Sequence, residues 1–240
     1  MGDNSTIEME QFLLRYRQSI LEQRTETITD FQAAFERFRK DYLTVKQAAG
    51  VRALTQAPGF NIFRLLGIQR LEARTHSIML AELLNPQGSH GQGELFLRAF
   101  LSYCHTRYPD FPYPVDEIGS SRWSVSTEMT SQFGRMDIVL LNPLLGFLGL
   151  IENKIDAYEQ EHQLERYGHW LDTHRQDFPT RALIYLTPYG GAAGTAGNYG
   201  YYRLSYRQDI AKWLEGTIPQ IQAPGVTEVV KQYLGTVERL

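Results

Sequence analysis

The sequence contains a single cysteine and no long apolar segment. Cys104 is alone among 240 residues, which excludes an internal disulfide and a multi-cysteine zinc or iron–sulfur site. No apolar run approaches the roughly 18 residues that a membrane-spanning helix needs. The opening residues, MGDNSTIEMEQF, are acidic and polar and are not typical of a signal peptide. We therefore expect a cytoplasmic protein that has no membrane partner.

Basic residues are not in excess, and few of them are lysines. The 24 basic and 27 acidic residues give a formal net charge of −3. A protein that binds nucleic acid through charge alone usually has a basic excess. Any contact with a phosphate backbone would therefore need a local positive field or metal ions. Only 5 of the 24 basic residues are lysines and 19 are arginines, so each lysine can be considered individually.

The first 60 residues predict a helical unit. Apolar residues recur at spacings of three and four over residues 5–48, which is typical of a helix. A break at Thr25 to Thr29 would turn this helix into a hairpin. We interpret residues 1–60 as a helical arm or hairpin, which either packs on the rest of the chain or forms a homodimer. The apolar positions include Phe12, Leu13, Tyr16, Ile20, Leu21, Ile28, Phe31, Phe35 and Phe38.

Residues 61–240 predict a second domain of the α/β class. The patterns indicate helices at 72–84 and 94–108, then strands at 122–130, 135–142 and 146–155. A helix at 157–176, a strand at 181–188, a short edge strand at 201–206 and two closing helices follow. The apolar strands at 135–142 and 146–155 are short and are bounded by turn residues, which is typical of central strands of a sheet. This order predicts a mixed sheet flanked by helices.

Three charged residues interrupt these apolar strands. Asp137 lies near the start of one strand, and Glu152 and Lys154 lie near the end of the next. Positions i and i+2 of a strand face the same way, so Glu152 and Lys154 project together. If the two strands pair antiparallel, Asp137 lies beside them. Two carboxylates and one ammonium would then converge at one point.

Such a cluster suits metal-assisted hydrolysis of phosphodiester bonds. Two neighbouring carboxylates do not readily ionise together unless a cation lies between them. Their oxygens suit Mg²⁺ or Mn²⁺, and Lys154 could stabilise charge in the transition state. The structural alternative is that Glu152 and Lys154 form an ion pair at the sheet edge while Asp137 caps a turn. Spacing alone leaves both interpretations open.

Neutral side chains follow on the next helix. Gln163 and Tyr167 are four residues apart and share one face, so they could bind a phosphate or a water molecule beside the carboxylates. Gln160 is a further candidate for substrate contact. Arg135, two residues before Asp137, could contact a phosphate or could be a solvated charge at the end of the strand.

Together these residues resemble the PD-(D/E)XK nuclease superfamily. The resemblance rests on Asp137, on Glu152-Asn153-Lys154, and on Gln163-Leu164-Glu165-Arg166-Tyr167, which is similar to the glutamine-to-tyrosine helix motif of the RecB-like branch. It extends from about Leu71 to Glu215. The proline that often precedes the first acid is replaced by Met136. The first 60 residues are not covered.

The resemblance implies a restriction-endonuclease-like core, of order αβββαβ, and a set of site residues. Asp137, Glu152 and the Asn153 carbonyl oxygen would be metal ligands, and Lys154 and Gln163 would join the two acids in the catalytic set. Glu72 is the matching candidate for an additional acid ligand, with Glu82 as a second choice. Glu72 could equally be an acid that interacts favourably with a helix N-terminus.

The function implied is that of a Mg²⁺- or Mn²⁺-dependent nuclease, with DNA favoured over RNA. Bacterial nucleases that resemble this chain are often associated with restriction, repair or defence against phage, and of these we expect phage defence. The alternative is a catalytically inactive nuclease-like domain that binds protein or nucleic acid. For the N-terminal helices we favour packing on the main domain; the alternative is a homodimer, since double-strand cutting benefits from two symmetry-related sites.

Overall fold

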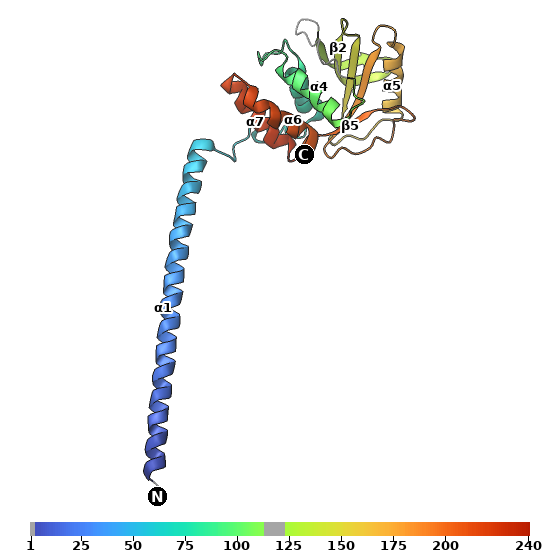
Figure 1. The fold of residues 1–240 in the computed structure, drawn as a ribbon. Coiled ribbons are helices and arrows are strands. Elements are labelled where there is room, and N and C mark those ends of the chain that lie inside the picture. The colour runs from blue at the N-terminus through green and yellow to red at the C-terminus, as the bar shows by residue number, and fades with distance from the viewer. Residues whose placement is uncertain (1–2, 113–122) are drawn as a thin grey trace. The chain divides into compact units, whose positions relative to one another are not determined.

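The computed structural model describes residues 3–112 and 123–240, and it describes side chains from residue 9 onward. The chain divides into two compact units, residues 1–60 and 61–240 (Figure 1). Within the described ranges, no helix combines the length and apolar character that a membrane span requires.

The first unit is dominated by one helix, α1 (Asp3–Gln56). The sequence led us to expect a break at Thr25 to Thr29, but the helix is continuous there. Each of Thr25, Thr27 and Thr29 donates its hydroxyl to the carbonyl oxygen four residues earlier, at 2.8 Å. Threonines that bond back onto their own helix in this way do not need to end it. This segment is therefore a single helical arm and not a hairpin.

The second unit is built on a five-stranded mixed sheet in the order β1-β2-β3-β4-β5. β1, β2 and β3 pair antiparallel, whereas β3, β4 and β5 pair parallel. The architecture confirms the predicted α/β fold with a restriction-endonuclease-like core. The strands are β1 (Ser124–Ser131), β2 (Gly134–Asn142), β3 (Phe147–Asn153), β4 (Thr180–Thr187) and β5 (Tyr202–Ser205).

Helices cover both faces of this sheet, so its central strands are buried on both sides. One face packs against α5 (Gln163–Thr173), through residues such as Leu164 and Trp170. The other face packs against the remaining helices, and Figure 1 shows α4, α6 and α7 on that side. These helices are α2 (Ile62–Leu65), η1 (Glu72–Ser77), α3 (Ile78–Leu84), α4 (Leu95–Arg107), η3 (Tyr206–Ile210), α6 (Ala211–Thr217), η4 (Ile218–Gln220) and α7 (Pro224–Val237).

The start of α5 differs from the prediction. We expected a helix from residue 157, but it begins at Gln163. His162 has a left-handed backbone with φ of 51°, which interrupts a right-handed helix. The Glu159 carboxylate accepts hydrogen bonds from the backbone N–H groups of Gly194 and Thr195. Residues 157–162 are therefore held as a loop against the glycine-rich segment after β4, a contact that spacing along the chain cannot predict.

The packing of α5 predicts a stability difference between two helical glycines. A Cβ atom on Gly168 would lie 2.2 Å from the ring of Tyr199, whereas one on Gly235 of α7 would meet nothing within 4 Å. We expect Gly168→Ala to destabilise the protein by about 1–3 kcal/mol through overpacking. The control Gly235→Ala should stabilise it by up to about 1 kcal/mol through helix propensity. Chemical denaturation measures both, and equal effects would contradict the packing described.

Candidate active site

Asp137, Glu152 and Lys154 converge at the adjoining ends of β2 and β3. The antiparallel register pairs Ile138 with Ile151, so the next position along each strand places Asp137 opposite Glu152. The Lys154 Nζ atom lies 2.7 Å from Glu152 Oε1. The convergence expected from strand alternation is therefore present. One ammonium and two carboxylates share this end of the sheet.

These charges are buried to an unusual degree. Asp137 is 8% exposed, Glu152 is fully buried, and the Lys154 side chain is 11% exposed. Burial raises the pKa of Asp137 to about 6, because removal from water disfavours the charged form. Burial, followed by the nearby charge of Asp137, raises the pKa of Glu152 to about 8. Burial alone would lower the pKa of Lys154, but Glu152 and the other nearby carboxylates raise it above its usual value.

Glu72, from the first turn of η1, lies at the edge of this cluster. Its Oε2 atom accepts a hydrogen bond of 2.6 Å from the N–H of Ile155. Its Oε1 atom lies 3.8 Å from Lys154 Nζ. Glu72 thus helps to fix the chain just after β3 and the lysine on it, and its role as a metal ligand stays a prediction. Glu82 lies outside the cluster, where it accepts hydrogen bonds from Ser89 and from the N–H of His90.

Gln163 and Tyr167 of α5 are joined to Glu152. Gln163 Nε2 donates to Glu152 Oε1 at 2.7 Å and also lies 3.2 Å from the Tyr167 hydroxyl. That hydroxyl donates to the Arg135 carbonyl oxygen at 2.5 Å, so Tyr167 links α5 to β2. Both side chains are buried. This arrangement suits residues that position Glu152 more than residues that contact substrate.

The other two candidates for substrate contact lie at the rim. The Arg135 side chain is 65% exposed and is ion-paired with Glu128 at 2.7 Å. Gln160 donates its backbone N–H to Gln163 Oε1 at 3.1 Å, and its side-chain oxygen accepts from Arg166 at 3.2 Å. Arg135 is therefore accessible to a ligand, whereas Gln160 orders the loop before α5.

Ser77 and Tyr206, which hold the Asn153 side chain, were not predicted from the sequence. The Asn153 side chain points to the opposite face of β3, where Tyr206 donates its hydroxyl to Asn153 Oδ1 at 2.9 Å. Asn153 Nδ2 lies 3.2 Å from Ser77 Oγ, and its backbone N–H donates to Asp137 Oδ2 at 2.8 Å. Asn153 therefore positions Asp137 through its backbone N–H, its side chain is engaged on the opposite face, and the role of its main-chain carbonyl as a metal ligand stays a prediction. Ser77 and Tyr206 come from distant elements, so no local pattern indicated them.

The donor set fits a hard divalent cation held by two carboxylates. Among the described residues, no three His, Cys, Asp or Glu side chains form a ready metal-binding group. However, Mg²⁺ typically needs only one or two protein carboxylates, with water and substrate oxygens completing its shell. Glu152 Oε2 is buried and has no hydrogen-bond partner in the part of the chain that the structure describes. An orphaned carboxylate oxygen opposite a second carboxylate is the feature that such a cation would satisfy.

The raised pKa values predict a stability that depends on pH and metal. A carboxyl group whose pKa is higher in the folded than in the unfolded state stabilises the fold at low pH, and this contribution is lost as pH rises through the folded value. The metal-free protein should therefore lose stability as the pH rises from about 4, the ordinary carboxyl value, to about 8, the folded value of Glu152. The Asp137 shift alone corresponds to about 3 kcal/mol at most.

Melting temperatures at pH 5.5 and 8.5, with chelator or with Mn²⁺, test this prediction. Asp137→Asn should reduce the loss at high pH and should abolish stabilisation by Mn²⁺. The control Glu161→Gln, at a side chain that is 91% exposed, should behave as the wild type. Equal Mn²⁺ effects in all three proteins would contradict a cation at Asp137.

Comparisons with known proteins agree with this geometry. A family model described as the PD-(D/E)XK nuclease superfamily matches residues 60–234, a range that includes Glu72, Asp137, Glu152, Lys154 and Gln163. No curated protein and no solved structure matches the chain. Because the family match covers most of the sequence and the second unit has the expected core, the chain belongs to the PD-(D/E)XK nuclease superfamily.

Proposed function

We propose that this protein is a hydrolase that cleaves phosphodiester bonds in DNA with the aid of Mg²⁺ or Mn²⁺. The observation that carries the proposal is the buried pair of Asp137 and Glu152 beside Lys154, in which one Glu152 oxygen has no partner among the described residues. A purely structural ion pair would need one carboxylate for one ammonium. Here two buried carboxylates and the half-buried Glu72 share one ammonium.

Each residue of the cluster has a defined task in this proposal. Asp137 and Glu152, together with the Asn153 carbonyl, would hold the cation. A bound divalent cation supplies Lewis acidity toward a phosphoryl oxygen and lowers the pKa of water. Lys154 keeps its proton at neutral pH because the neighbouring carboxylates raise its pKa. Its ammonium can therefore donate hydrogen bonds to the negative charge that develops on the phosphate.

Gln163 and the Asn153 N–H act as positioning groups. Gln163 Nε2 holds Glu152 Oε1 at 2.7 Å, which leaves Oε2 for the cation. The Asn153 N–H holds Asp137 Oδ2 at 2.8 Å, which leaves Oδ1 for the same purpose. Arg135, exposed at the rim, is the group we propose for contact with a substrate phosphate.

The wider role is also part of the proposal. The resemblance to bacterial nucleases supports action in the cytoplasm against phage DNA. The exposed apolar side chains along α1 support a homodimer formed through this helix. Expression in a bacterial host with and without Lys154→Ala, followed by phage plating, tests the defence role. Equal plaque counts for the two proteins would contradict it.

Lysine substitution tests the proposed chemistry directly. Lys154→Ala should reduce DNA cleavage by at least about 100-fold, because it removes a preorganised cationic donor at the reacting phosphate. Lys212→Ala, at an exposed residue of α6, is the matched control and should cleave normally. The assay compares double-stranded DNA, single-stranded DNA and RNA with Mg²⁺, with Mn²⁺ and with chelator.

The outcome separates an enzyme from a binding module. Cleavage by wild type and Lys212→Ala, but not by Lys154→Ala, supports the nuclease. Binding of nucleic acid by all three proteins without cleavage under any metal condition would support an inactive nuclease-like domain. Cleavage of RNA alone would contradict DNA as the substrate but not the hydrolytic chemistry.

Gln163 should act through Glu152 and not by contact with substrate. We expect Gln163→Ala to lower cleavage by about 10–100-fold, the range typical of groups that orient metal ligands. It should also raise the Mn²⁺ concentration needed for half-maximal activity, and saturating Mn²⁺ should restore part of the rate. If only the affinity for DNA changed, Gln163 would be a substrate contact and the positioning role would be contradicted.

A further inference from the structure

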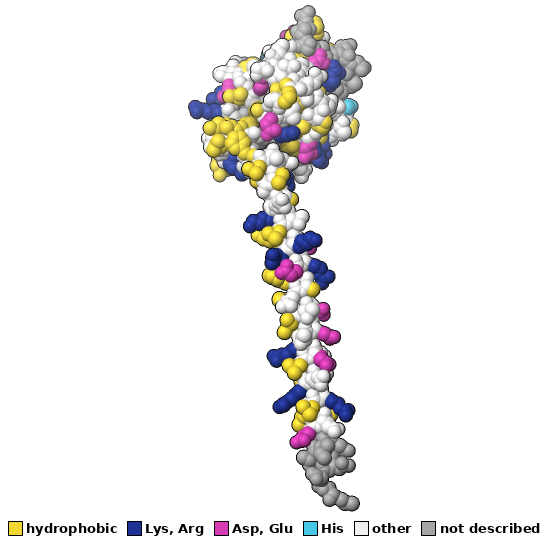
Figure 2. All heavy atoms as spheres, turned by 90° about the vertical axis from the view of Figure 1, so that its left-hand side faces the viewer, with side chains coloured by type: hydrophobic (Ala, Val, Ile, Leu, Met, Phe, Trp, Pro, Cys, Tyr) yellow, Lys and Arg dark blue, Asp and Glu magenta, His cyan; other side chains and the backbone are white. Residues whose placement is uncertain are grey.

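An apolar stripe on α1 has no partner within the unit that contains it. Its residues follow the alternating three- and four-residue spacing of a heptad repeat, in which such positions form one seam. Their side chains are between 53% and 71% exposed, and Figure 2 shows apolar side chains recurring along the helix. Exposed apolar surface that is continuous usually marks an interaction site. The stripe consists of Ile28, Phe31, Phe35, Phe38, Tyr42 and Val45.

A helix of this length and composition is expected to need packing. α1 spans 54 residues, and every side chain described from residue 9 to residue 56 is exposed. Most helix stability in proteins comes from packing of an apolar face. The centre of the helix also carries Thr25, Thr27, Ile28 and Thr29, which are β-branched residues of lower helix propensity. The stripe that begins at Ile28 is the surface available for packing.

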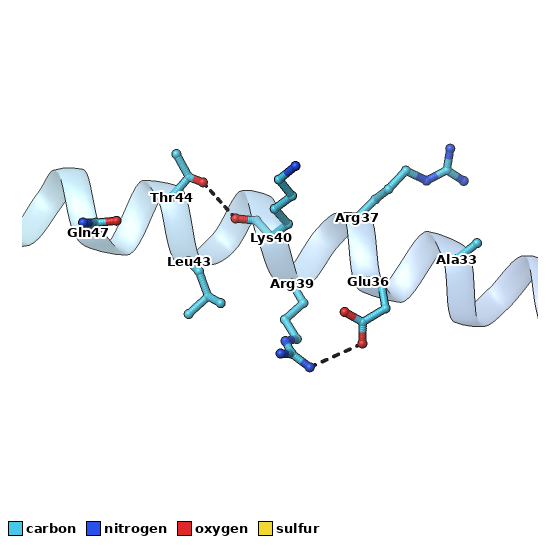
Figure 3. Close-up of a pocket in the computed structure, with 8 residues that line it drawn as sticks. All are labelled: Ala33, Glu36, Arg37, Arg39, Lys40, Leu43, Thr44 and Gln47. Atoms are coloured by element: carbon cyan, nitrogen blue, oxygen red, sulfur yellow. Dashed lines mark hydrogen bonds and ion pairs between the residues drawn. The ribbon is translucent and has the colours of Figure 1, made fainter.

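The charges of α1 are divided between its two halves. Residues 3–30 contain six acidic and three basic residues, which gives a net charge of −3. Residues 31–56 contain two acidic and five basic residues, which gives +3. Figure 3 shows part of the basic half, where Arg37 and Lys40 extend to one side, and Arg39 extends to the other side and pairs with Glu36 at 3.3 Å. The helix is thus complementary in charge to a reversed copy of itself.

We propose that α1 pairs with α1 of a second copy as an antiparallel coiled coil centred between Glu36 and Arg37. In this register Ile28 lies opposite Val45, Phe31 opposite Tyr42, and Phe35 opposite Phe38. All six apolar residues of the stripe are then matched with apolar residues of the partner helix. This proposal deepens the homodimer proposed above and does not depend on nuclease activity.

Charge selects the antiparallel arrangement over the parallel one. In the proposed register residues 17–36, with a net charge of −2, lie along residues 37–56 of the other helix, with a net charge of +4. In a parallel pair, the two negative segments would lie beside each other, and so would the two positive segments, so that like charges would repel. Opposite helix dipoles also favour the antiparallel pair. Burial of the apolar stripe would stabilise a helix pair in either orientation, and the charges favour the antiparallel one.

The arrangement has a consequence for the two nuclease units. The paired segment covers residues 17–56, and at 1.5 Å per residue the C-terminal ends of the two helices lie about 60 Å apart. Each nuclease unit therefore begins at an opposite end of the coiled coil. The cluster of Glu72, Asp137, Glu152, Lys154 and Gln163 comes from one chain, so neither copy needs residues of the other.

Cysteine cross-linking of the full chain tests the orientation. Ile28→Cys and Val45→Cys are made separately, and the only native cysteine, Cys104, is buried. A disulfide needs Cα atoms within about 7 Å. In the proposed register the two copies of residue 28 are 17 positions, or about 25 Å, apart along the axis. We expect no cross-link in either variant alone and a disulfide dimer when the two are mixed and oxidised.

Light scattering on the full chain tests the association itself. The wild type should have twice the chain mass of 27.6 kDa, and Phe35→Asp should have the mass of one chain. Ala33→Asp places the same charge on the opposite side of the helix and should remain dimeric. Retained metal-dependent melting in Phe35→Asp would show that the nuclease unit is intact.

Three outcomes would overturn the proposal. The first is a wild-type protein of single-chain mass at tens of micromolar concentration. The second is cross-linking of Ile28→Cys alone, which would indicate a parallel pair. The third is a dimer that survives Phe35→Asp. None of these outcomes bears on the DNA cleavage that requires Lys154. Failure of the dimer and failure of the nuclease therefore remain distinguishable.

Discussion

The rest of the site depends on one constraint: two carboxylates are confined with a single ammonium at the adjoining ends of β2 and β3. Asp137 and Glu152 are almost completely removed from water, an environment that strongly disfavours unpaired charge. Lys154 balances one of them at 2.7 Å. The remaining negative charge is what a divalent cation would neutralise, and burial is the main reason for the raised pKa values of both acids.

The surrounding structure holds these charges in place through hydrogen bonds from three directions. Gln163 of α5 donates a hydrogen bond to Glu152. The backbone N–H of Asn153 donates to Asp137. Glu72 of η1 accepts from the backbone just after β3. Gln163 occupies one carboxylate oxygen of Glu152 and the Asn153 N–H occupies one of Asp137, and within the described part of the chain the other Glu152 oxygen has no hydrogen-bond partner. The burial of these charges costs stability, and the hydrogen bonds around them keep them in a geometry that suits a divalent cation.

The sequence predicted those parts of the structure that follow from local periodicity. Alternation along a strand was enough to place Glu152 and Lys154 together, and the four-residue spacing was enough to place Gln163 and Tyr167 on one face of α5. It could not predict that α5 begins at Gln163, because the loop before it is fixed by Glu159 and a segment more than 30 residues away. Ser77 and Tyr206 were missed for the same reason. At Thr25 to Thr29 we overestimated the tendency of threonine to end a helix.

The most direct measurement of the central claim is anomalous diffraction from crystals of the protein grown with Mn²⁺. The account predicts one strong peak between Asp137 and Glu152, at about 2.2 Å from a carboxylate oxygen of each, with Lys154 still beside Glu152. Absence of a peak there, with the two carboxylates neutralised only by Lys154 and by protons, would contradict it.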